Sequence, residues 1–208
     1  MATGRPKKRY HHGGLREALI EAAEQELAEK GIEGFTLRGV AKRAGVSHAA
    51  PAHHFRDTGE LLTALAAVGA QRFLSGMTER EAAAGDDPRG RFVATGRAYI
   101  EFALANPALF ELMFGSKRPD FDEPIYTTPA SQSFRVLVDG IAALRGDDPL
   151  TSREGRAAVM SAWSLVHGFA SLVIAGRVRF IREDFEADPT GTIERLIAPV
   201  VPRPEEKR

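Results

Sequence analysis

The chain has 208 residues, in which 28 basic side chains balance 28 acidic ones, and it contains no cysteine. This length can bury a sizeable core in one large or two small domains, and the composition is that of an ordinary globular protein. The absence of cysteine excludes disulfides, thiolate zinc sites and thiol nucleophiles, and it fits a protein of the reducing cytoplasm.

Charge is distributed most unevenly at the N-terminus. Residues 1–9 contain four cations and no acid, and two histidines follow at positions 11 and 12. The four cations are Arg5, Lys7, Lys8 and Arg9. We interpret residues 1–12 as a basic arm on a neutral body, although the same charges would also suit a solvated terminus. The segment lacks an apolar core with a small-residue cleavage site, so we expect no secretory signal.

Helical periodicity begins directly after this arm. From residue 15 to residue 27, apolar residues recur at the i, i+3 and i+4 spacing, with glutamates around the remaining sides. Lys30 and Gly31 should end this helix, because glycine readily adopts the left-handed conformation of a helix C-terminus. Thr36 then fits the N-cap of a short second helix over residues 37–44.

Further cap signals bound the helices that follow. Gly45 should end the second helix, and Ser47 should cap a third. Pro51 would cost up to about 3 kcal/mol in a helix interior, so we expect it in the first turn of the third helix, where the cost is smaller. Asp57 or Thr58 should cap a fourth helix. That helix is expected to turn inward Leu61, Leu62 and Leu65.

Three short helices with turns at Gly31 and Gly45 predict a helix-turn-helix unit, in which the third helix lies in the major groove of DNA. Ala41 is small enough to let the second and third helices approach closely. The groove-facing side would combine alanines, which let the helix sit deep, with imidazoles, which can donate to or accept from bases and phosphates. That side comprises His48, Ala49, Ala52 and His53.

Beyond residue 83 the chain reads as a second helical unit. The segment AAAGDDPRG predicts a loop, after which a long helix should end before Pro107 and a shorter aromatic-rich helix should follow. Residues 115–130 contain three prolines and are expected to form an irregular loop. Further helices are predicted near residues 130–145, 151–177 and 189–198. No strand-like alternation competes convincingly, so we predict an all-α fold.

Aromatic and methionine side chains gather in the two helices on either side of Pro107. They are Tyr99, Phe102, Phe110, Met113 and Phe114. At helical spacing such residues usually form core, but if some line a cavity, its ligand is largely apolar with few polar groups to orient it. Trp163 and His167 lie one turn apart and could present an indole N–H and an imidazole to that cavity, or be satisfied core residues.

Residues 157–176 contain no Asp, Glu, Lys or Arg, and their length is about that of a membrane span. Serines and a histidine within the segment lower its affinity for lipid, so we expect no membrane span. Together with the helix near residues 189–198, this segment offers a surface too apolar to remain in contact with water. The second helix contributes Ile193, Leu196 and Ile197. We therefore predict a homodimer with a four-helix interface built from these two helices of each copy.

The segment TLRGVAKRAGVSHAAPAHHF, preceded by LREALIEAAEQELAEKGIEGF and followed by LL, resembles the DNA-binding domain of TetR-family transcriptional regulators. The resemblance covers roughly residues 12–66. It implies an all-helical homodimer in which residues 13–60 form a helix-turn-helix domain that reads operator DNA. Residues 61–208 would form a helical domain that dimerises and binds a small molecule that releases the DNA. The segment AWSLVHGFASLV resembles the signature of one C-terminal subgroup, at Trp163, His167 and Gly168.

Two departures from the family pattern bear on DNA binding. Family members usually place an aromatic residue at Ala52 and a lysine at Thr58, and both commonly contact phosphates, so their loss should weaken docking. The basic arm can compensate by gathering phosphates or entering the minor groove, which adds affinity without sequence information. Beside the arm cations, the candidate DNA-binding residues are Thr36, Arg38, Lys42, Ser47, His48, Ala49, Ala52, His53 and His54. Arg38 and Lys42 could equally form an ordinary exposed helix face.

Other classes of function have less support in the sequence. Because it lacks a glycine-rich phosphate loop, a His-Glu-x-x-His helix and a Gly-x-Ser-x-Gly elbow, we predict no enzyme. His53 and His54 would point about 100° apart on a helix and lack a third ligand, so no metal or other cofactor is expected. A non-specific architectural DNA-binding protein remains an alternative, and it would show little preference between duplex sequences.

Overall fold

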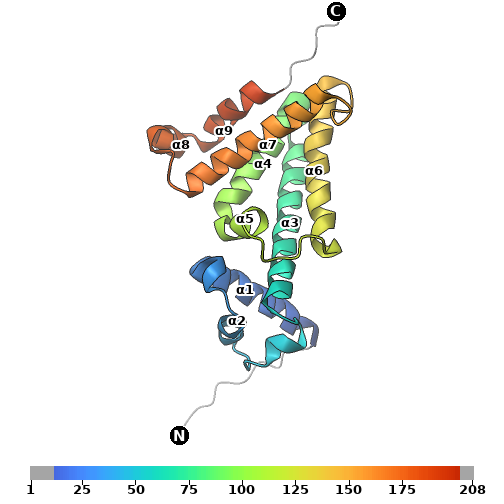
Figure 1. The fold of residues 1–208 in the computed structure, drawn as a ribbon. Helices are drawn as coiled ribbons and strands as arrows, with labels where there is room; N and C mark the ends of the chain where they lie inside the picture. The colour runs from blue at the N-terminus through green and yellow to red at the C-terminus, as the bar shows by residue number, and fades with distance from the viewer. Residues whose placement is uncertain (1–11, 202–208) are drawn as a thin grey trace, which may run out of the picture.

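The computed structural model describes residues 12–201, which form two helical units stacked end to end (Figure 1). All regular structure in this range is helical, which confirms the predicted all-α fold. The α-helices are α1 (His12–Gly34), α2 (Leu37–Ala44), α3 (Thr58–Ala83), α4 (Pro88–Ala105), α5 (Pro107–Phe114), α6 (Pro124–Arg145), α7 (Arg153–Ile174), α8 (Arg182–Ala187) and α9 (Pro189–Ile197). Three short 3₁₀ helices complete the described range, namely η1 (Ala50–His53), η2 (Arg179–Ile181) and η3 (Ala198–Val200).

The first unit, which we call the head, lies at the bottom of Figure 1 and consists of α1, α2, η1 and the beginning of α3. Gly31 has a positive φ of 66° and interrupts α1 close to the end that the sequence predicts. A small apolar core holds these helices together. It contains Leu19, Leu27, Val40, Phe55, Leu61, Leu62 and Leu65. The inward placement of the three α3 leucines is therefore confirmed.

Helix α3 belongs to both units. The Asp57 carboxylate caps it by accepting from the backbone N–H of Glu60 at 2.9 Å, as one of the two predicted caps. From the head the helix runs upward in Figure 1 through the second unit, where it packs against α4, α5 and α6. The predicted domain boundary at residue 60 thus falls in the first turn of a helix that continues to Ala83.

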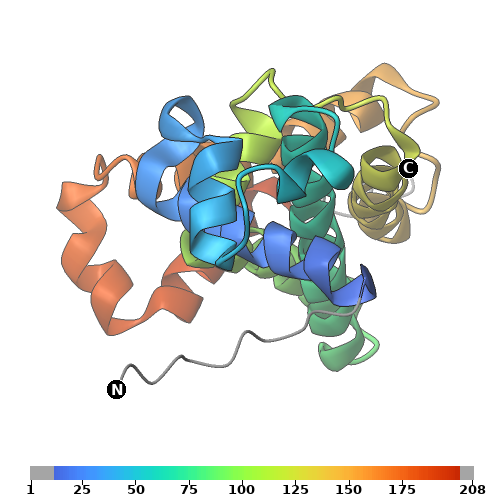
Figure 2. The ribbon, with the colours of Figure 1, turned by 90° about the horizontal axis from the view of Figure 1, so that it is seen from below.

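The second unit is a bundle in which α4 lies between α3, α6, α7 and α9. The loop predicted after residue 83 and the break at Pro107 are both confirmed. Seen from below in Figure 2, the segment that contains α8 projects to one side of the bundle. Figure 1 shows the same segment at the upper left, beside α9 and away from the head.

The predicted irregular loop over residues 115–130 is wrong beyond residue 123. Helix α6 begins at Pro124 and includes Pro129, which is buried in its second turn. Proline is favoured at the first helical position, where its missing N–H would have no partner, so Pro124 starts the helix rather than preventing it. Pro129 removes a single backbone hydrogen bond, and the helix continues beyond it.

Candidate functional site

Helix α2 has the two caps that the sequence predicts. The Thr36 hydroxyl accepts from the backbone N–H of Gly39 at 3.0 Å, and Gly45 ends the helix with a φ of 69°. The backbone N–H of Val46 donates back to the Ala41 carbonyl at 3.0 Å, which closes the turn. Ala41 itself is fully buried, in agreement with the expected close approach at this position. The turn geometry is therefore set by local sequence.

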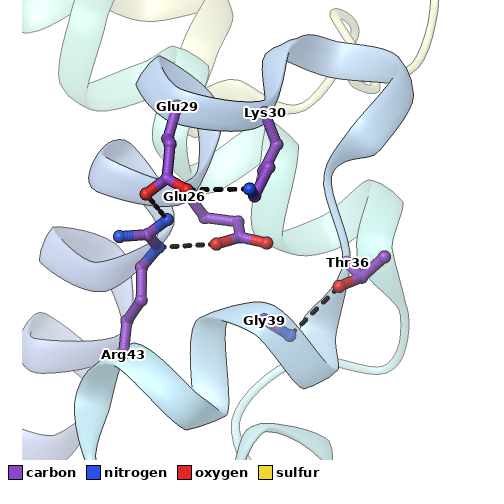
Figure 3. Close-up of polar contacts among 6 residues, drawn as sticks. All are labelled: Glu26, Glu29, Lys30, Thr36, Gly39 and Arg43. Carbon is purple, nitrogen blue, oxygen red and sulfur yellow. Dashed lines mark hydrogen bonds and ion pairs between the residues drawn. The ribbon is translucent and has the colours of Figure 1, made fainter.

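An ionic cluster fixes α2 against α1 (Figure 3). The guanidinium of Arg43 donates to the carboxylates of Glu26 and Glu29, and Lys30 pairs with Glu29 at 2.8 Å. Hydrogen bonds from Lys30 and Arg43 lower the pKa of Glu29 to about 2. Glu26 is buried, and its carboxylate occupies the space that a side chain on Gly39 would need. The glycine thus makes room for the buried acid.

The predicted third helix is only a single 3₁₀ turn, η1. Ser47 does not cap it with its side chain; instead, the Ser47 carbonyl accepts from the backbone N–H of Ala50 at 3.0 Å. Pro51 lies in the first turn, as predicted, and is buried. Phe55, four residues later, is also buried, and α3 begins at Thr58.

The predicted DNA-binding residues lie on one part of the head, along α2, the turn and η1. Eight of them are exposed, namely Thr36, Arg38, Lys42, Ser47, His48, Ala49, Ala52 and His53. His54 is half-buried, and its backbone N–H donates to the Pro51 carbonyl at 2.9 Å. Arg5, Lys7, Lys8 and Arg9 lie outside the described residues. The structure thus places exposed imidazoles, alanines and two cations side by side along consecutive elements.

A cavity of about 330 Å³ lies inside the second unit, between α3, α4, α5, α6 and α7. Four predicted ligand-binding residues line it, namely Tyr99, Met113, Phe114 and Trp163. Phe102 and Phe110 are buried in the aromatic cluster behind them, and His167 lies against Tyr99 and Phe110. The sequence reasoning missed other lining residues, among them Phe73, Met77, Thr95, Phe121, Tyr126 and Ser133.

Tyr99 is the centre of a short polar chain at the cavity wall. The indole N–H of Trp163 donates to its hydroxyl at 3.3 Å, and the hydroxyl lies 2.9 Å from Nδ1 of His167. Burial raises the pKa of Tyr99 and lowers the pKa of His167, so both are neutral at physiological pH. The two neutral groups thus share a single hydrogen bond between the hydroxyl oxygen and Nδ1.

The loop over residues 115–123 connects the cavity to the head. Phe121 lines the cavity and stacks on Tyr126 with ring centroids 4.8 Å apart. One residue earlier, the backbone N–H of Asp120 donates to the Thr63 hydroxyl on α3 at 2.8 Å. Arg118 donates to the carbonyl of Ile32 at the end of α1. The loop that carries Phe121 is thus hydrogen-bonded to two helices of the head, α1 and α3.

Helix α7 exposes large apolar side chains. Met160, Leu172 and Ile174 are exposed on it, and Phe134 and Phe180 are exposed on neighbouring segments. By length and composition alone, α7 could cross a membrane; in the fold, one side of it packs against α4, α6 and α9. Two of the apolar residues predicted for a dimer surface on α9, Ile193 and Ile197, are instead buried within the chain.

Comparison with known proteins identifies both units. The family described as bacterial regulatory proteins of the tetR family matches residues 19–65. The family described as the C-terminal domain of tetracyclin repressor-like proteins matches residues 92–199, which is just over half of the chain. The matches agree with the head and the second unit as the structure shows them.

Comparison with individual relatives supports the same assignment. A solved structure of a protein with unknown function from Rhodococcus sp. RHA1 is 32% identical and has a TM-score of 0.72, with 91% of this chain and 98% of that chain covered. The HTH-type transcriptional regulator Rv1816 of Mycobacterium tuberculosis is 28% identical over 153 residues, and the match spans 70% of this chain and 64% of the relative. The HTH-type transcriptional regulator BetI of Burkholderia mallei is 38% identical over 92 residues, which are 42% of this chain and 47% of BetI.

These matches confirm the resemblance read from residues 12–66 and identify a regulator rather than an enzyme. The assignment to a Trp-His-Gly subgroup stays a prediction. The chain belongs to the TetR family of bacterial transcriptional regulators, and its head is the DNA-binding helix-turn-helix domain of that family.

Proposed function

We propose that this protein is a ligand-responsive repressor that binds a palindromic operator as a homodimer in the cytoplasm and is released by a small, largely apolar molecule. The observation that carries the proposal is the course of α3. Leu61 and Leu65 of this helix are packed in the head, while Phe73 and Met77 line the cavity. One rigid element thus joins the surface that reads DNA to the space that can hold a ligand.

The DNA-reading role of the head is supported by its exposed residues. His48 and His53 can hydrogen-bond to base edges in the major groove, and the small side chain of Ala52 lets η1 approach the bases. Arg38 and Lys42 are exposed on α2 and would neutralise phosphates, and the cations of the basic arm would add to this effect. Base contacts would then supply specificity, and the cations would supply affinity.

Dimerisation is supported by the exposed apolar face of α7. One head presents a single η1 and reads only a few base pairs, so a specific site requires two heads about 34 Å apart. Pairing α7 of two copies would cover exposed apolar side chains such as Met160 and Leu172 through a two-fold contact. The same pairing would shield the apolar side of α7 from water, so this helix would not need to lie in a membrane.

Release of DNA would result from thermodynamic linkage between ligand binding in the cavity and DNA binding by the head. A ligand can release the operator only if it binds better to the shape in which the two heads are wrongly spaced. The cavity lies against α3 and against the loop over residues 115–123, and both also contact the head. A ligand that shifts Phe121 or Met77 therefore acts on the elements that position η1.

The decisive experiment is selection of bound duplexes from a random pool at physiological salt. The proposal predicts a palindromic consensus whose half-sites lie about one helical turn apart. Binding without enrichment of any sequence would instead identify an architectural DNA-binding protein. Compounds that bind the cavity should then lower the affinity for the selected duplex, and unchanged operator affinity with every bound compound would contradict ligand release.

A further inference from the structure

The chemical character of the cavity wall restricts the ligand. None of the described residues that line the cavity is Asp, Glu, Lys, Arg or His. A charged ligand would lose its hydration inside the cavity without gaining a counter-ion, which is strongly unfavourable. The cavity, at about 330 Å³, is near the lower end of the usual range of about 300–1,000 Å³ for ligand pockets. An uncharged and compact molecule fits these walls.

Four of the five polar side chains on the wall already form hydrogen bonds within the chain. The hydroxyls of Thr95 and Ser133 donate to the carbonyls of Phe92 and Pro129, each at 2.9 Å. The Trp163 indole donates to the Tyr99 hydroxyl, which shares a second hydrogen bond with Nδ1 of His167. Thr95, Ser133 and Trp163 therefore cannot offer a hydrogen to a ligand without breaking an internal bond. The oxygens of Thr95 and Ser133 keep a lone pair that can accept.

Tyr126 is the exception. Its side chain is buried, with 9% of the residue exposed, and its hydroxyl forms no hydrogen bond with any residue in the described range. Burial raises the pKa of Tyr126, so the hydroxyl keeps its hydrogen at physiological pH. The hydroxyl is not among the fully enclosed polar atoms that lack a partner, so it remains accessible to a ligand that supplies an acceptor.

We propose that the cavity binds an uncharged, compact apolar molecule that carries one hydrogen-bond acceptor, such as a ketone or ester carbonyl, and that the Tyr126 hydroxyl donates to this acceptor. The inference rests on the proposed function in that it takes the cavity to be the effector site. It goes further by naming the ligand class and the residue that selects it. The contact lies beside Phe121, so the acceptor is held next to the loop that reaches the head.

The test uses three probes built on one ring: cyclooctanone, cyclooctane and cyclooctanecarboxylate. Trp163 is the only tryptophan of the chain and lines the cavity, so its fluorescence reports binding directly. The full-length protein should bind the ketone about three- to tenfold more tightly than the hydrocarbon, as expected for one neutral hydrogen bond. The carboxylate should bind at least about tenfold more weakly than the ketone.

Tyr126→Phe removes the donor and keeps the ring. It should reduce the ketone affinity to that of the hydrocarbon or below, because the carbonyl then lacks a donor, while retained binding of cyclooctane shows that the variant is folded. Equal or tighter binding of the carboxylate, an unaffected ketone affinity in Tyr126→Phe, or no fluorescence response to either neutral probe would overturn the inference. These titrations contain no DNA. Ketone binding that leaves operator affinity unchanged would therefore count against the proposed function and not against the ligand class.

Discussion

The backbone N–H of Asp120 donates to the hydroxyl of Thr63, which in turn donates to the Gly59 carbonyl at 2.9 Å. The loop over residues 115–123 is thereby hydrogen-bonded to the first turns of α3. Thr63→Val keeps the shape of the side chain but leaves the Asp120 N–H without a partner, which should lower the free energy of unfolding by about 1–3 kcal/mol. It should also weaken the effect of ligand on operator affinity, because the loop is no longer held to α3.

Thr78→Val is the matched control for this variant. Thr78 lies further along α3, and its hydroxyl donates only to carbonyls of its own helix. Fluorescence anisotropy with a labelled operator, with and without ligand, measures the coupling in both variants. Equal coupling in Thr63→Val and Thr78→Val would show that the Asp120 contact does not transmit the signal.

Gly39 is expected to be intolerant of alanine because of the Glu26 carboxylate. An alanine in an exposed helix normally stabilises the helix by about 0.5–1 kcal/mol relative to glycine. Gly76→Ala should show this gain, because no atom lies within 4 Å of the new Cβ. Gly39→Ala must displace the acid that Arg43 holds, so it should be less stable than Gly76→Ala by about 1–3 kcal/mol. Urea unfolding of the two variants measures the difference, and equal midpoints would contradict it.

His167 should make stability depend on pH. Burial lowers its pKa in the folded protein, so as pH falls below the ordinary value of 6.5 the unfolded chain takes up the proton first. The contribution of neutral His167 to the free energy of unfolding is complete above pH 6.5. It is lost as the pH falls through the pKa that His167 has in the folded protein. His167→Asn can keep an acceptor toward Tyr99 without titrating. Melting temperatures at pH 7.5 and 5.5 should therefore fall less in the variant, and an identical fall would rule out this role.

The cations of the head should set the salt dependence of DNA binding. The logarithm of the DNA-binding constant falls linearly with the logarithm of the salt concentration. The slope of this line decreases in magnitude by about 0.9 for each phosphate that the protein no longer neutralises. Lys42→Ala should show this change at every duplex sequence, and deletion of residues 2–9 should show a larger one. Arg89→Ala, at the start of α4 beyond the other end of α3, serves as the control and should leave the slope unchanged. A slope unaffected by Lys42→Ala would assign this lysine to an ordinary solvated face.

The dimer surface can be tested with a pair of equally exposed residues. Leu172 on α7 and Ile125 at the start of α6 are 50% and 51% exposed. Leu172→Glu would bury a carboxylate in the proposed interface and should yield monomers in light scattering at micromolar concentration, while Ile125→Glu should leave the dimer intact. A monomeric wild-type protein, or a dimer that survives Leu172→Glu, would place the interface elsewhere.

The head was largely predictable because its signals are local. Thr36, Gly45 and Asp57 cap helices through contacts within a few residues, and such contacts can be read along the chain. The brevity of η1 was not predicted, because it depends on the burial of Pro51 and Phe55 against the rest of the head. The pairing of Glu26 with Arg43 also joins residues on two helices, which no local pattern specifies.

The cavity was less predictable for a related reason. Its aromatic helices could be identified from spacing, but spacing does not separate Tyr99, which lines the cavity, from Phe102, which is buried behind it. Phe121 and Tyr126 fall in the stretch predicted as a proline-rich loop, and only the start of α6 at Pro124 brings them to the cavity wall.

The unbroken length of α3 has a mechanical consequence. At about 1.5 Å per residue, its 26 residues make a rod about 39 Å long, so a tilt of about 3° about the cavity end moves the other end by about 2 Å. In a two-fold pair the two displacements add or cancel according to their direction. In the proposed homodimer, an effector would need to rotate this helix by only a few degrees to change the spacing of the two heads along a double helix.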